Sequence, residues 1–255
     1  MDPQGAGFAY GFGLFETIKF SAGRLALWQA HWARLQASAN TLKLDCDFKE
    51  SAVLDAIRSL IDQDQLVDSM IKVSLVRARF STQLLVYSRP RISAPSSVEL
   101  QLEPLYPLNP QSLLAGHKTH NYMENFAILE GARRAGSYDA IRLDPLGYLA
   151  ETTIGNLFYI NKGHICTPAR RHGILPGVVR AALLTLHAVQ EGSYFADQLQ
   201  AAEAVFMTNS GAGVLPVSRV TGAGTDCSFE SHAHPLVVEL SNAFSQYEQK
   251  HSQLV

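Results

Sequence analysis

A proline-rich stretch near the middle of this 255-residue chain limits what the chain can fold into. The segment that begins at Pro104 reads PLYPLNPQSLLA and places three prolines within seven residues. Proline has no amide hydrogen to donate and restricts the residue before it, so neither a helix nor a sheet interior continues through this stretch. We therefore expect a small α+β domain at residues 1–106, a linker at 107–115 and a larger domain at 116–255.

Strands and helices are expected on both sides of the linker, from the spacing of apolar and β-favouring residues. The expected strands cover residues 8–20, 70–80, 82–88, 98–105, 139–143, 148–152, 157–160, 164–167 and 204–207. The expected helices cover residues 27–42, 51–61 and 122–135, and a further helix starts after the pair Pro176-Gly177. No internal repeat is present.

Composition and charge exclude several classes of function. The formal net charge is −2 and the basic residues are scattered, which provides no basic track for a nucleic acid. No apolar run reaches the roughly 18 residues that span a bilayer, and the N-terminus lacks the basic start and cleavage site of a signal peptide. We expect a cytoplasmic protein that binds a small molecule, with no nucleic-acid or membrane partner.

Neither cysteines nor histidines are spaced for a metal site. The cysteines at 46, 166 and 227 are far apart, which predicts reduced thiols without a disulfide framework. The close histidine pairs at 117/120 and 232/234 lack a carboxylate or cysteine at metal-ligand spacing. We expect no bound metal.

The search for a reactive amine is short, because the chain has only seven lysines. Lys72 alternates with apolar neighbours on a predicted strand and should face solvent, Lys162 lies in a turn and Lys250 lies in the polar tail. Lys118 follows the linker and precedes a helix, where a cleft between domains could desolvate its amine. These surroundings alone are also compatible with a solvated or structural lysine.

Glu151, Arg34 and two turns could serve a phosphorylated cofactor. Glu151 follows a short strand and is either exposed or paired, and a carboxylate beside a pyridine nitrogen would keep that nitrogen protonated. The turns at 173–177 and 208–211 could present free amides to a phosphate or be plain connections. Arg34 could reach the same phosphate or lie on a helix surface. The residues alone leave these alternatives open.

Seven motifs, all in one order, resemble those of the class IV aminotransferase family. They are GFGLFET at 11–17, HWARL at 31–35, KTHNY at 118–122, ETTIGNLF at 151–158, TP at 167–168, GILPGVVR at 173–180 and TNSGAGVLPV at 208–217. The resemblance covers nearly the whole chain. It implies a two-domain, fold-type IV enzyme that uses pyridoxal 5'-phosphate (PLP), with a small N-terminal α+β domain and a larger C-terminal α/β domain containing a barrel-like sheet.

The resemblance also implies roles for individual residues. Lys118 is similar to the family's Schiff-base lysine, Glu151 to the carboxylate at the pyridine nitrogen and Arg34 to the phosphate-binding arginine. The other implied cofactor contacts are the amides of Val178 and Val179, the hydroxyl of Ser210, and Tyr122, which the resemblance places near the cofactor's phenolic oxygen. The phosphate turn departs from the family pattern, because Val179 replaces a threonine and removes one hydroxyl donor.

Among the branches of the family, the motifs FET and KTHNY are most similar to the aminodeoxychorismate lyases. The hairpin after Val76 is short and lacks the later arginine and histidine with which D-amino-acid aminotransferases bind a substrate carboxylate. The resemblance thus implies a homodimeric lyase that releases pyruvate and forms 4-aminobenzoate for folate biosynthesis. The alternatives are a class IV aminotransferase acting on branched-chain or D-amino acids, and a non-catalytic PLP-binding relative, against which the intact Lys118 and Glu151 count.

Overall fold

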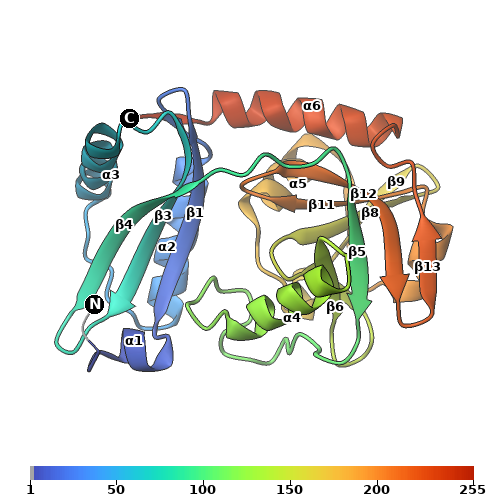
Figure 1. The fold of residues 1–255 in the computed structure, drawn as a ribbon, viewed down its shortest axis with the longest axis horizontal. Coiled ribbons are helices and arrows are strands. Elements are labelled where there is room, and N and C mark those ends of the chain that lie inside the picture. Colours follow the sequence, from blue (N-terminus) through green and yellow to red (C-terminus); the bar gives the residue numbers. More distant parts are fainter. Residues whose placement is uncertain (1–2) are drawn as a thin grey trace. The chain divides into compact units, whose positions relative to one another are not determined.

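The computed structural model describes residues 3–255, which form two compact units, each with its own sheet and apolar core (Figure 1). The first unit comprises the described residues up to Ile92 together with His117–Tyr122 and Tyr247–Val255. The second unit comprises Ser93–Gly116 and Met123–Gln246. The chain therefore passes between the units more than once, and not only at the proline-rich segment.

The first unit is built on a five-stranded antiparallel sheet with the order β14-β2-β1-β3-β4. Its strands are β1 (Gly13–Ser21), β2 (Arg24–Leu25), β3 (Asp68–Arg77), β4 (Thr82–Pro90) and β14 (Gln253–Leu254), and its helices are α1 (Ala6–Tyr10), α2 (Trp28–Thr41) and α3 (Glu50–Asp64). Leu14, Ile18 and Phe20 of β1 are buried in a core that also holds Trp28 and Trp32 of α2. The two-residue period of the strand thus decides which side chains of β1 face the core.

The strand expected at residues 8–20 is wrong at its start. Residues Ala6–Tyr10 form α1, and Gly11 ends this helix in the left-handed conformation at φ 67°. Glycine adopts that conformation without the steric cost of a Cβ. Phe8 and Tyr10 favour strands by composition, but here they are exposed and β1 begins only at Gly13.

The second unit contains a nine-stranded sheet in which six strands close into a barrel. The closed order is β8-β11-β12-β5-β6-β7, and β7 pairs with β8 to complete it. The strands are β5 (Val98–Glu103), β6 (Asp139–Leu143), β7 (Leu149–Thr152), β8 (Asn156–Asn161), β9 (His164–Pro168), β10 (Val189–Gly192), β11 (Ala204–Asn209), β12 (Gly213–Gly222) and β13 (Thr225–Ser228). The helices are α4 (Met123–Arg134), α5 (Val178–Leu186) and α6 (Pro235–Lys250), the last of which continues into the first unit from Tyr247, and 3-10 turns lie at Arg170–His172 and Ala196–Ala201. The barrel-like sheet expected for the larger domain is confirmed.

The division between the units differs from the expected boundary at residue 106. Strand β5 pairs in parallel with β12 and β6, so it lies in the second unit although it precedes the prolines. At the other end of the chain, β14 pairs with β2, and the amide of Val255 donates to the carbonyl of Gly23. These pairings join residues that are far apart in the sequence, so no local sequence pattern predicts them.

The helices are short by the standard of membrane proteins. The two longest, α3 and α6, have 15 and 16 residues. Within residues 3–255, no helix combines the length and the apolar character that crossing a membrane requires.

Phe20 and Phe80 provide a matched test of the core of the first unit, because they are 2% and 87% exposed. We expect Phe20→Ala to lower the free energy of unfolding by about 3–5 kcal/mol, since it leaves a cavity. Phe80→Ala should change it by less than about 0.5 kcal/mol. Urea unfolding followed by circular dichroism measures both, and equal losses would contradict this description of the core.

Candidate active site

Lys118 lies in a short extended segment that pairs with β1. The amide of Phe15 donates to the carbonyl of Lys118 at 2.9 Å, and the amide of His120 donates to the carbonyl of Gly13 at 2.9 Å. Nζ of Lys118 lies 4.6 Å from the centroid of the Phe15 ring, which Tyr122 meets edge-on at a centroid distance of 5.4 Å. Strand β1 therefore determines where the backbone of this lysine lies.

A second amine approaches the same phenyl ring. Lys72 on β3 lies opposite Thr17 on β1, with Nζ 3.5 Å from the Phe15 ring centroid and 3.0 Å from the Thr17 hydroxyl. The expectation that Lys72 faces solvent is wrong, because the residue is only 7% exposed. Strand β3 lies between β1 and β4 in the sheet and is buried along almost its whole length. The apolar residues on either side of Lys72 in the sequence therefore do not indicate that Lys72 faces solvent.

The surroundings of Lys72 disfavour its charge. Burial, and then the positive charges of Lys118 and Arg89, lower the pKa of Lys72 to about 7, against the opposing effect of Glu16. Among the residues that the structure describes, Lys72 forms no ion pair, and its polar side-chain contact is with the Thr17 hydroxyl. A buried ammonium without a counter-charge is a candidate for binding an anion.

The opposite face of β1 buries a carboxylate. Glu16 accepts hydrogen bonds from Nε and Nη2 of Arg34 at 2.8 and 2.6 Å, and its Oε2 lies 2.7 Å from Nδ1 of His31. Burial by itself would raise the pKa of Glu16, but the charges and hydrogen bonds of Arg34 and His31 lower it to about 2. Two donors of Arg34, the predicted phosphate ligand, are therefore directed at Glu16.

In the second unit, Glu151 is paired and not simply exposed. It lies on β7 opposite Asn156 of β8, at the pairing that closes the barrel. Its Oε2 accepts hydrogen bonds from Nδ2 of Asn156 at 3.1 Å and from the amide of Leu175 at 2.9 Å. Closure of the barrel thus places the carboxylate beside the turn at 173–177.

That turn leads into α5, as the sequence predicts. Gly177 precedes the helix and no side chain caps it, so the amides of Val178 and Val179 lie in a first turn where the helix itself offers no acceptor. A Cβ on Gly177 would lie 2.1 Å from Oδ1 of Asn156. A side chain at position 177 would therefore force Asn156, whose amide supports Glu151, to shift.

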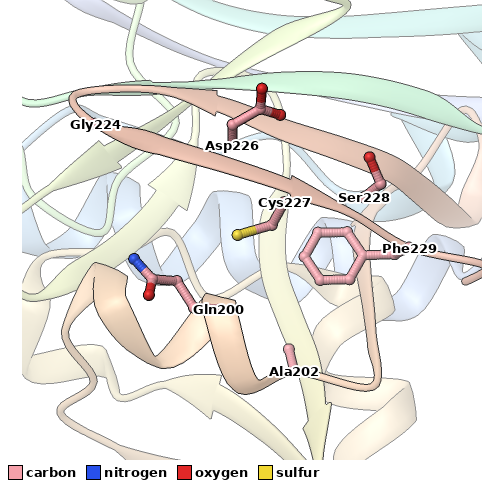
Figure 2. Close-up of a pocket in the computed structure, with 7 residues that line it drawn as sticks. All are labelled: Gln200, Ala202, Gly224, Asp226, Cys227, Ser228 and Phe229. Atoms are coloured by element: carbon pink, nitrogen blue, oxygen red, sulfur yellow. The ribbon is translucent and has the colours of Figure 1, made fainter.

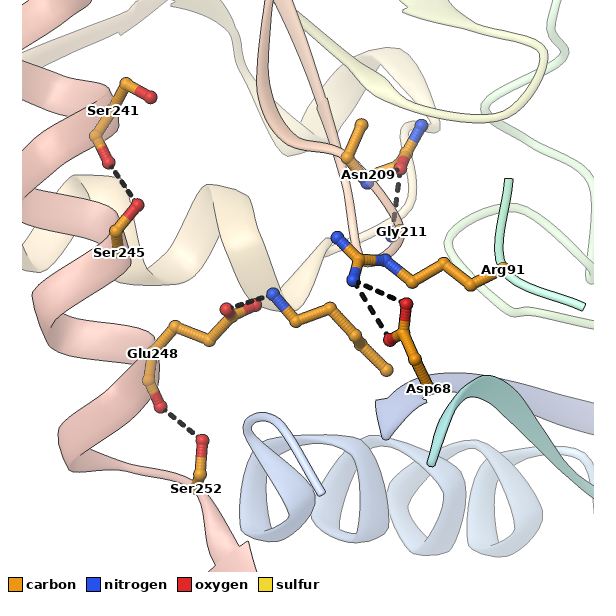
Figure 3. A network of polar contacts seen from close by, with 10 residues as sticks. Asp68, Arg91, Asn209, Gly211, Ser241, Ser245, Glu248 and Ser252 are labelled. Carbon is orange, nitrogen blue, oxygen red and sulfur yellow. Dashed lines mark hydrogen bonds and ion pairs between the residues drawn. The ribbon is translucent and has the colours of Figure 1, made fainter. Parts of the chain in front are cut away.

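Ser210 lies in the turn between β11 and β12. Oδ1 of Asn209 accepts hydrogen bonds from the amides of Gly211 at 3.0 Å and Ala212 at 2.9 Å, and Figure 3 shows the first of them. In the same segment, Oγ1 of Thr208 is buried and has no hydrogen-bond partner among the described residues. This turn is therefore held by a side chain and keeps one buried hydroxyl unsatisfied.

The predicted site residues fall into two groups. Arg34, Lys118 and Tyr122 belong to the first unit, and Glu151, Val178, Val179 and Ser210 belong to the second. Within the second unit, the structure brings Glu151 beside the turn that precedes α5. That the two groups form one site stays a prediction.

Sequence reasoning missed four polar residues that support these groups, namely Glu16, His31, Lys72 and Asn156. The sequence does contain a signal for Glu16. It lies two residues from Leu14 and two from Ile18, so on a strand it shares the face that these buried residues occupy. A carboxylate on the face that packs in the core requires a charged or hydrogen-bonding partner. No comparable signal marks Asn156, whose role depends on the pairing of β7 with β8.

A surface pocket elsewhere in the second unit does not contain any predicted site residue (Figure 2). It is lined by Gln200, Ala202, Gly224, Asp226, Cys227, Ser228 and Phe229. Its carboxylate, Asp226, is already engaged by Nε and Nη2 of Arg219 at 2.9 and 2.8 Å. This pocket is therefore not the candidate active site.

The chain belongs to the class IV aminotransferase family, whose model matches residues 13–220. It is an enzyme of that family, and the members of the family depend on PLP.

Its relatives include lyases and aminotransferases. It is 30% identical to an aminodeoxychorismate lyase from Vibrio harveyi, over 87% of this chain and 88% of that protein. It is 24% identical to a D-alanine aminotransferase from Bacillus licheniformis, over 87% and 83% of the two chains. A candidate 4-amino-4-deoxychorismate lyase from Legionella pneumophila has a similar structure, with a TM-score of 0.87, 27% identity and coverage of 94% and 92%.

Glu16→Gln tests the buried ionic cluster. Because its pKa is lowered from 4.5 to about 2, the carboxylate contributes stability that is fully present above pH 4.5 and is lost as the pH falls toward 2. The shift corresponds to roughly 3 kcal/mol. We expect the free energy of unfolding of Glu16→Gln to depend much less on pH over this range. Urea unfolding at a series of pH values measures it, and the exposed control Glu130→Gln should keep the wild-type slope.

Proposed function

We propose that this enzyme is a PLP-dependent 4-amino-4-deoxychorismate lyase that releases pyruvate, forms 4-aminobenzoate and so serves folate biosynthesis. The observation that carries the proposal is the similarity to a lyase along nearly the full length of both chains. The placement of two amines, Lys118 and Lys72, at one aromatic ring supports it. One amine suits proton transfer and the other suits a substrate that carries carboxylates.

PLP fits the polar groups that the chain offers, and when bound it supplies an electron sink for a carbon that loses a proton. The uncapped amides of Val178 and Val179 would hold its phosphate, and the unpartnered Oγ1 of Thr208 is a further donor close in sequence to Ser210. The absence of a threonine at position 179 removes one hydroxyl, and Thr208 offers another.

The remaining contacts follow from the family pattern. Glu151, held by Asn156 and the amide of Leu175, would keep the pyridine nitrogen of PLP protonated. Lys118 would bind the cofactor covalently, with the ring of Tyr122 beside it. Arg34 would contact the phosphate.

The proposed reaction requires a base that can also return a proton. Substrate binding frees the amine of Lys118, which then removes the proton from the ring carbon that carries the substrate amine. The electron pair of that C–H bond enters the ring system as the bond to the pyruvate oxygen breaks, and the amine returns its proton to the departing pyruvate. Formation of an aromatic ring makes the overall step favourable.

Lys72 suits recognition of the substrate. Its ammonium is buried, hydrogen-bonded to the Thr17 hydroxyl and without a carboxylate partner among the described residues. Burying a charge without a partner is costly, and a ligand carboxylate would reduce that cost. 4-Amino-4-deoxychorismate carries two carboxylates, one on the ring and one on the enolpyruvyl group.

An aminotransferase acting on branched-chain or D-amino acids is the second candidate, and the similarity to a D-alanine aminotransferase favours it. Lys118 would then move a proton between the substrate α-carbon and the cofactor, so the shared residues do not separate the two reactions. The connection between β3 and β4 counts against the D-amino-acid branch. It spans only residues 78–81, and the later arginine and histidine of that branch are missing.

The enzyme is further proposed to act as a cytoplasmic homodimer. The first unit exposes Phe8 and Tyr10 of α1, two aromatic side chains that a second copy could cover.

The decisive assay offers purified enzyme 4-amino-4-deoxychorismate, and in separate reactions D-alanine or leucine with 2-oxoglutarate. Formation of 4-aminobenzoate and pyruvate in equal amounts supports the lyase. Formation of glutamate without 4-aminobenzoate would instead support the aminotransferase.

Replacing Lys118 and Glu151 should separate covalent binding from chemistry. We expect Lys118→Ala to abolish the covalent attachment of PLP and nearly all turnover. Glu151→Gln should keep PLP bound but slow the reaction roughly a hundredfold, about 3 kcal/mol of barrier, because glutamine cannot keep the pyridine nitrogen protonated. Borohydride reduction followed by mass spectrometry reports the attachment, and steady-state kinetics report the rate.

The exposed Lys162 provides the control for Lys118, since Lys162→Ala should retain attachment and rate. Covalent cofactor on another lysine in Lys118→Ala would show that the assignment of Lys118 is wrong.

Lys72→Met should raise the KM for 4-amino-4-deoxychorismate at least about tenfold, because a carboxylate loses its cation. Lys72→Arg should recover most of the affinity, and the exposed Lys49→Met should not change it. Because the pKa of Lys72 is about 7 and only the protonated amine is charged, affinity in the wild type should fall as the pH rises through about 7. Steady-state kinetics at several pH values measure this, and an unchanged KM in Lys72→Met would refute the role.

A further inference from the structure

Three side chains of the second unit form a chain of hydrogen bonds that the proposed lyase reaction does not use. Oδ2 of Asp144, directly after β6, lies 2.8 Å from Nδ1 of His172, and Nε2 of His172 lies 2.9 Å from Oγ of Ser193. Asp144 and His172 are 5% and 4% exposed, whereas Ser193 is partly exposed. A carboxylate, an imidazole and a hydroxyl joined in this order are the arrangement that activates a serine as a nucleophile.

The surroundings hold the carboxylate and the imidazole in place. Oδ1 of Asp144 accepts hydrogen bonds from the amides of Leu146 and Tyr148, both at 2.9 Å, which leaves Oδ2 for His172. The ring of Tyr148 lies against the imidazole at a centroid distance of 5.3 Å. The imidazole is therefore oriented before any ligand binds, which is what a base of this kind requires.

The donors around Ser193 decide where its own proton points. Nε and Nη2 of Arg171 lie 3.2 and 3.0 Å from Oγ of Ser193, and a guanidinium only donates hydrogen bonds. These donors use both lone pairs of Oγ, so the hydroxyl donates its hydrogen to Nε2 of His172. His172 then carries its ring proton on Nδ1, where the carboxylate of Asp144 accepts it. Nε2 therefore has a lone pair that can take up the serine proton.

We propose that Ser193 is the nucleophile of a second site, which hydrolyses small carboxylic esters with His172 as the base and Asp144 as a positioning residue. The O–H bond of Ser193 breaks, its proton passes to Nε2 of His172, and Oγ forms a bond with the acyl carbon. The ester C–O bond then breaks, and the oxygen of the leaving alcohol takes the proton from Nε2. Water repeats these steps on the acyl group, so that its proton passes through Nε2 to Oγ as the carboxylic acid leaves. This reaction goes beyond the proposed lyase activity and uses only side chains of this chain.

Arg171 supplies the positive charge that the attack requires. Negative charge develops on the carbonyl oxygen during the attack, and a guanidinium beside that oxygen stabilises it. Because Arg171 is exposed and already contacts Oγ, a small movement brings its donors to the oxygen of the acyl group. The same movement frees a lone pair of Oγ for the new bond.

A fluorophosphonate probe tests the nucleophile directly, because the probe forms a covalent bond with an activated serine hydroxyl. In the purified wild-type enzyme, mass spectrometry of tryptic peptides should find the label on Ser193. Ser193→Ala should lose this label and at least about tenfold of the rate of p-nitrophenyl acetate hydrolysis. Ser228→Ala is the control, because Ser228 is an exposed serine of the same unit and this variant should keep label and rate.

Asp144→Asn tests the positioning role without changing the size of the side chain. The amide of asparagine donates to Nδ1 and moves the ring proton to Nε2, so labelling of Ser193 should slow at least about tenfold. Long-range proton–nitrogen NMR of the His172 ring reports that change of tautomer, which a merely structural role of Asp144 would not link to the labelling rate.

The absence of label on Ser193 in the wild type would overturn the proposal, as would an unchanged rate of ester hydrolysis in Ser193→Ala. The label does not depend on PLP or on turnover of 4-amino-4-deoxychorismate. Labelled Ser193 in an enzyme that forms no 4-aminobenzoate would therefore support this site while the proposed lyase function fails.

Discussion

The alternation of side chains along β1 is the constraint on which the first unit depends. One face of the strand carries Phe15 and Thr17 toward Lys72 and the 118–122 segment, and the other carries Glu16 toward α2. A shift of the register by one residue would exchange these faces. The nine-residue pairing of β1 with β3 prevents such a shift. The same backbone therefore presents an aromatic ring to two amines and a carboxylate to the core.

The two faces of β1 differ in whether a buried charged group has a partner of opposite charge. Glu16 is satisfied by Arg34 and His31, so its ionised form is strongly favoured and the cluster stabilises the fold. Lys72 has no counter-charge among the described residues and its charged form is disfavoured. A buried group left in that state is costly to the fold, and such groups are concentrated where ligands bind. The contrast separates a structural ionic cluster at Glu16 from a candidate binding group, Lys72, which lies on β3 opposite the next residue of β1, Thr17.

The second unit positions its polar groups through closure of the barrel. Pairing of β7 with β8 places Glu151 opposite Asn156, and the Asn156 side chain also reaches the carbonyl of Leu175 at 2.9 Å. The carboxylate and the turn that precedes α5 are thus joined by hydrogen bonds. Gly177 leaves room there for Asn156, because a Cβ at this position would force the Asn156 side chain to shift. Preorganised groups of this kind lose little entropy when a ligand binds.

The sequence by itself determined the family, the order of the motifs, most of the strands and helices, and the residues proposed to hold the cofactor. Those features depend on local spacing and on motifs that a single chain displays. The tertiary structure decided the burial of Lys72, the partners of Glu16 and Arg34, and the support of Glu151 by Asn156. It also placed β5 in the second unit and β14 in the first. Each of these depends on which distant strands pair, and pairing partners are chosen by the packing of the whole fold and not by any local pattern of residues.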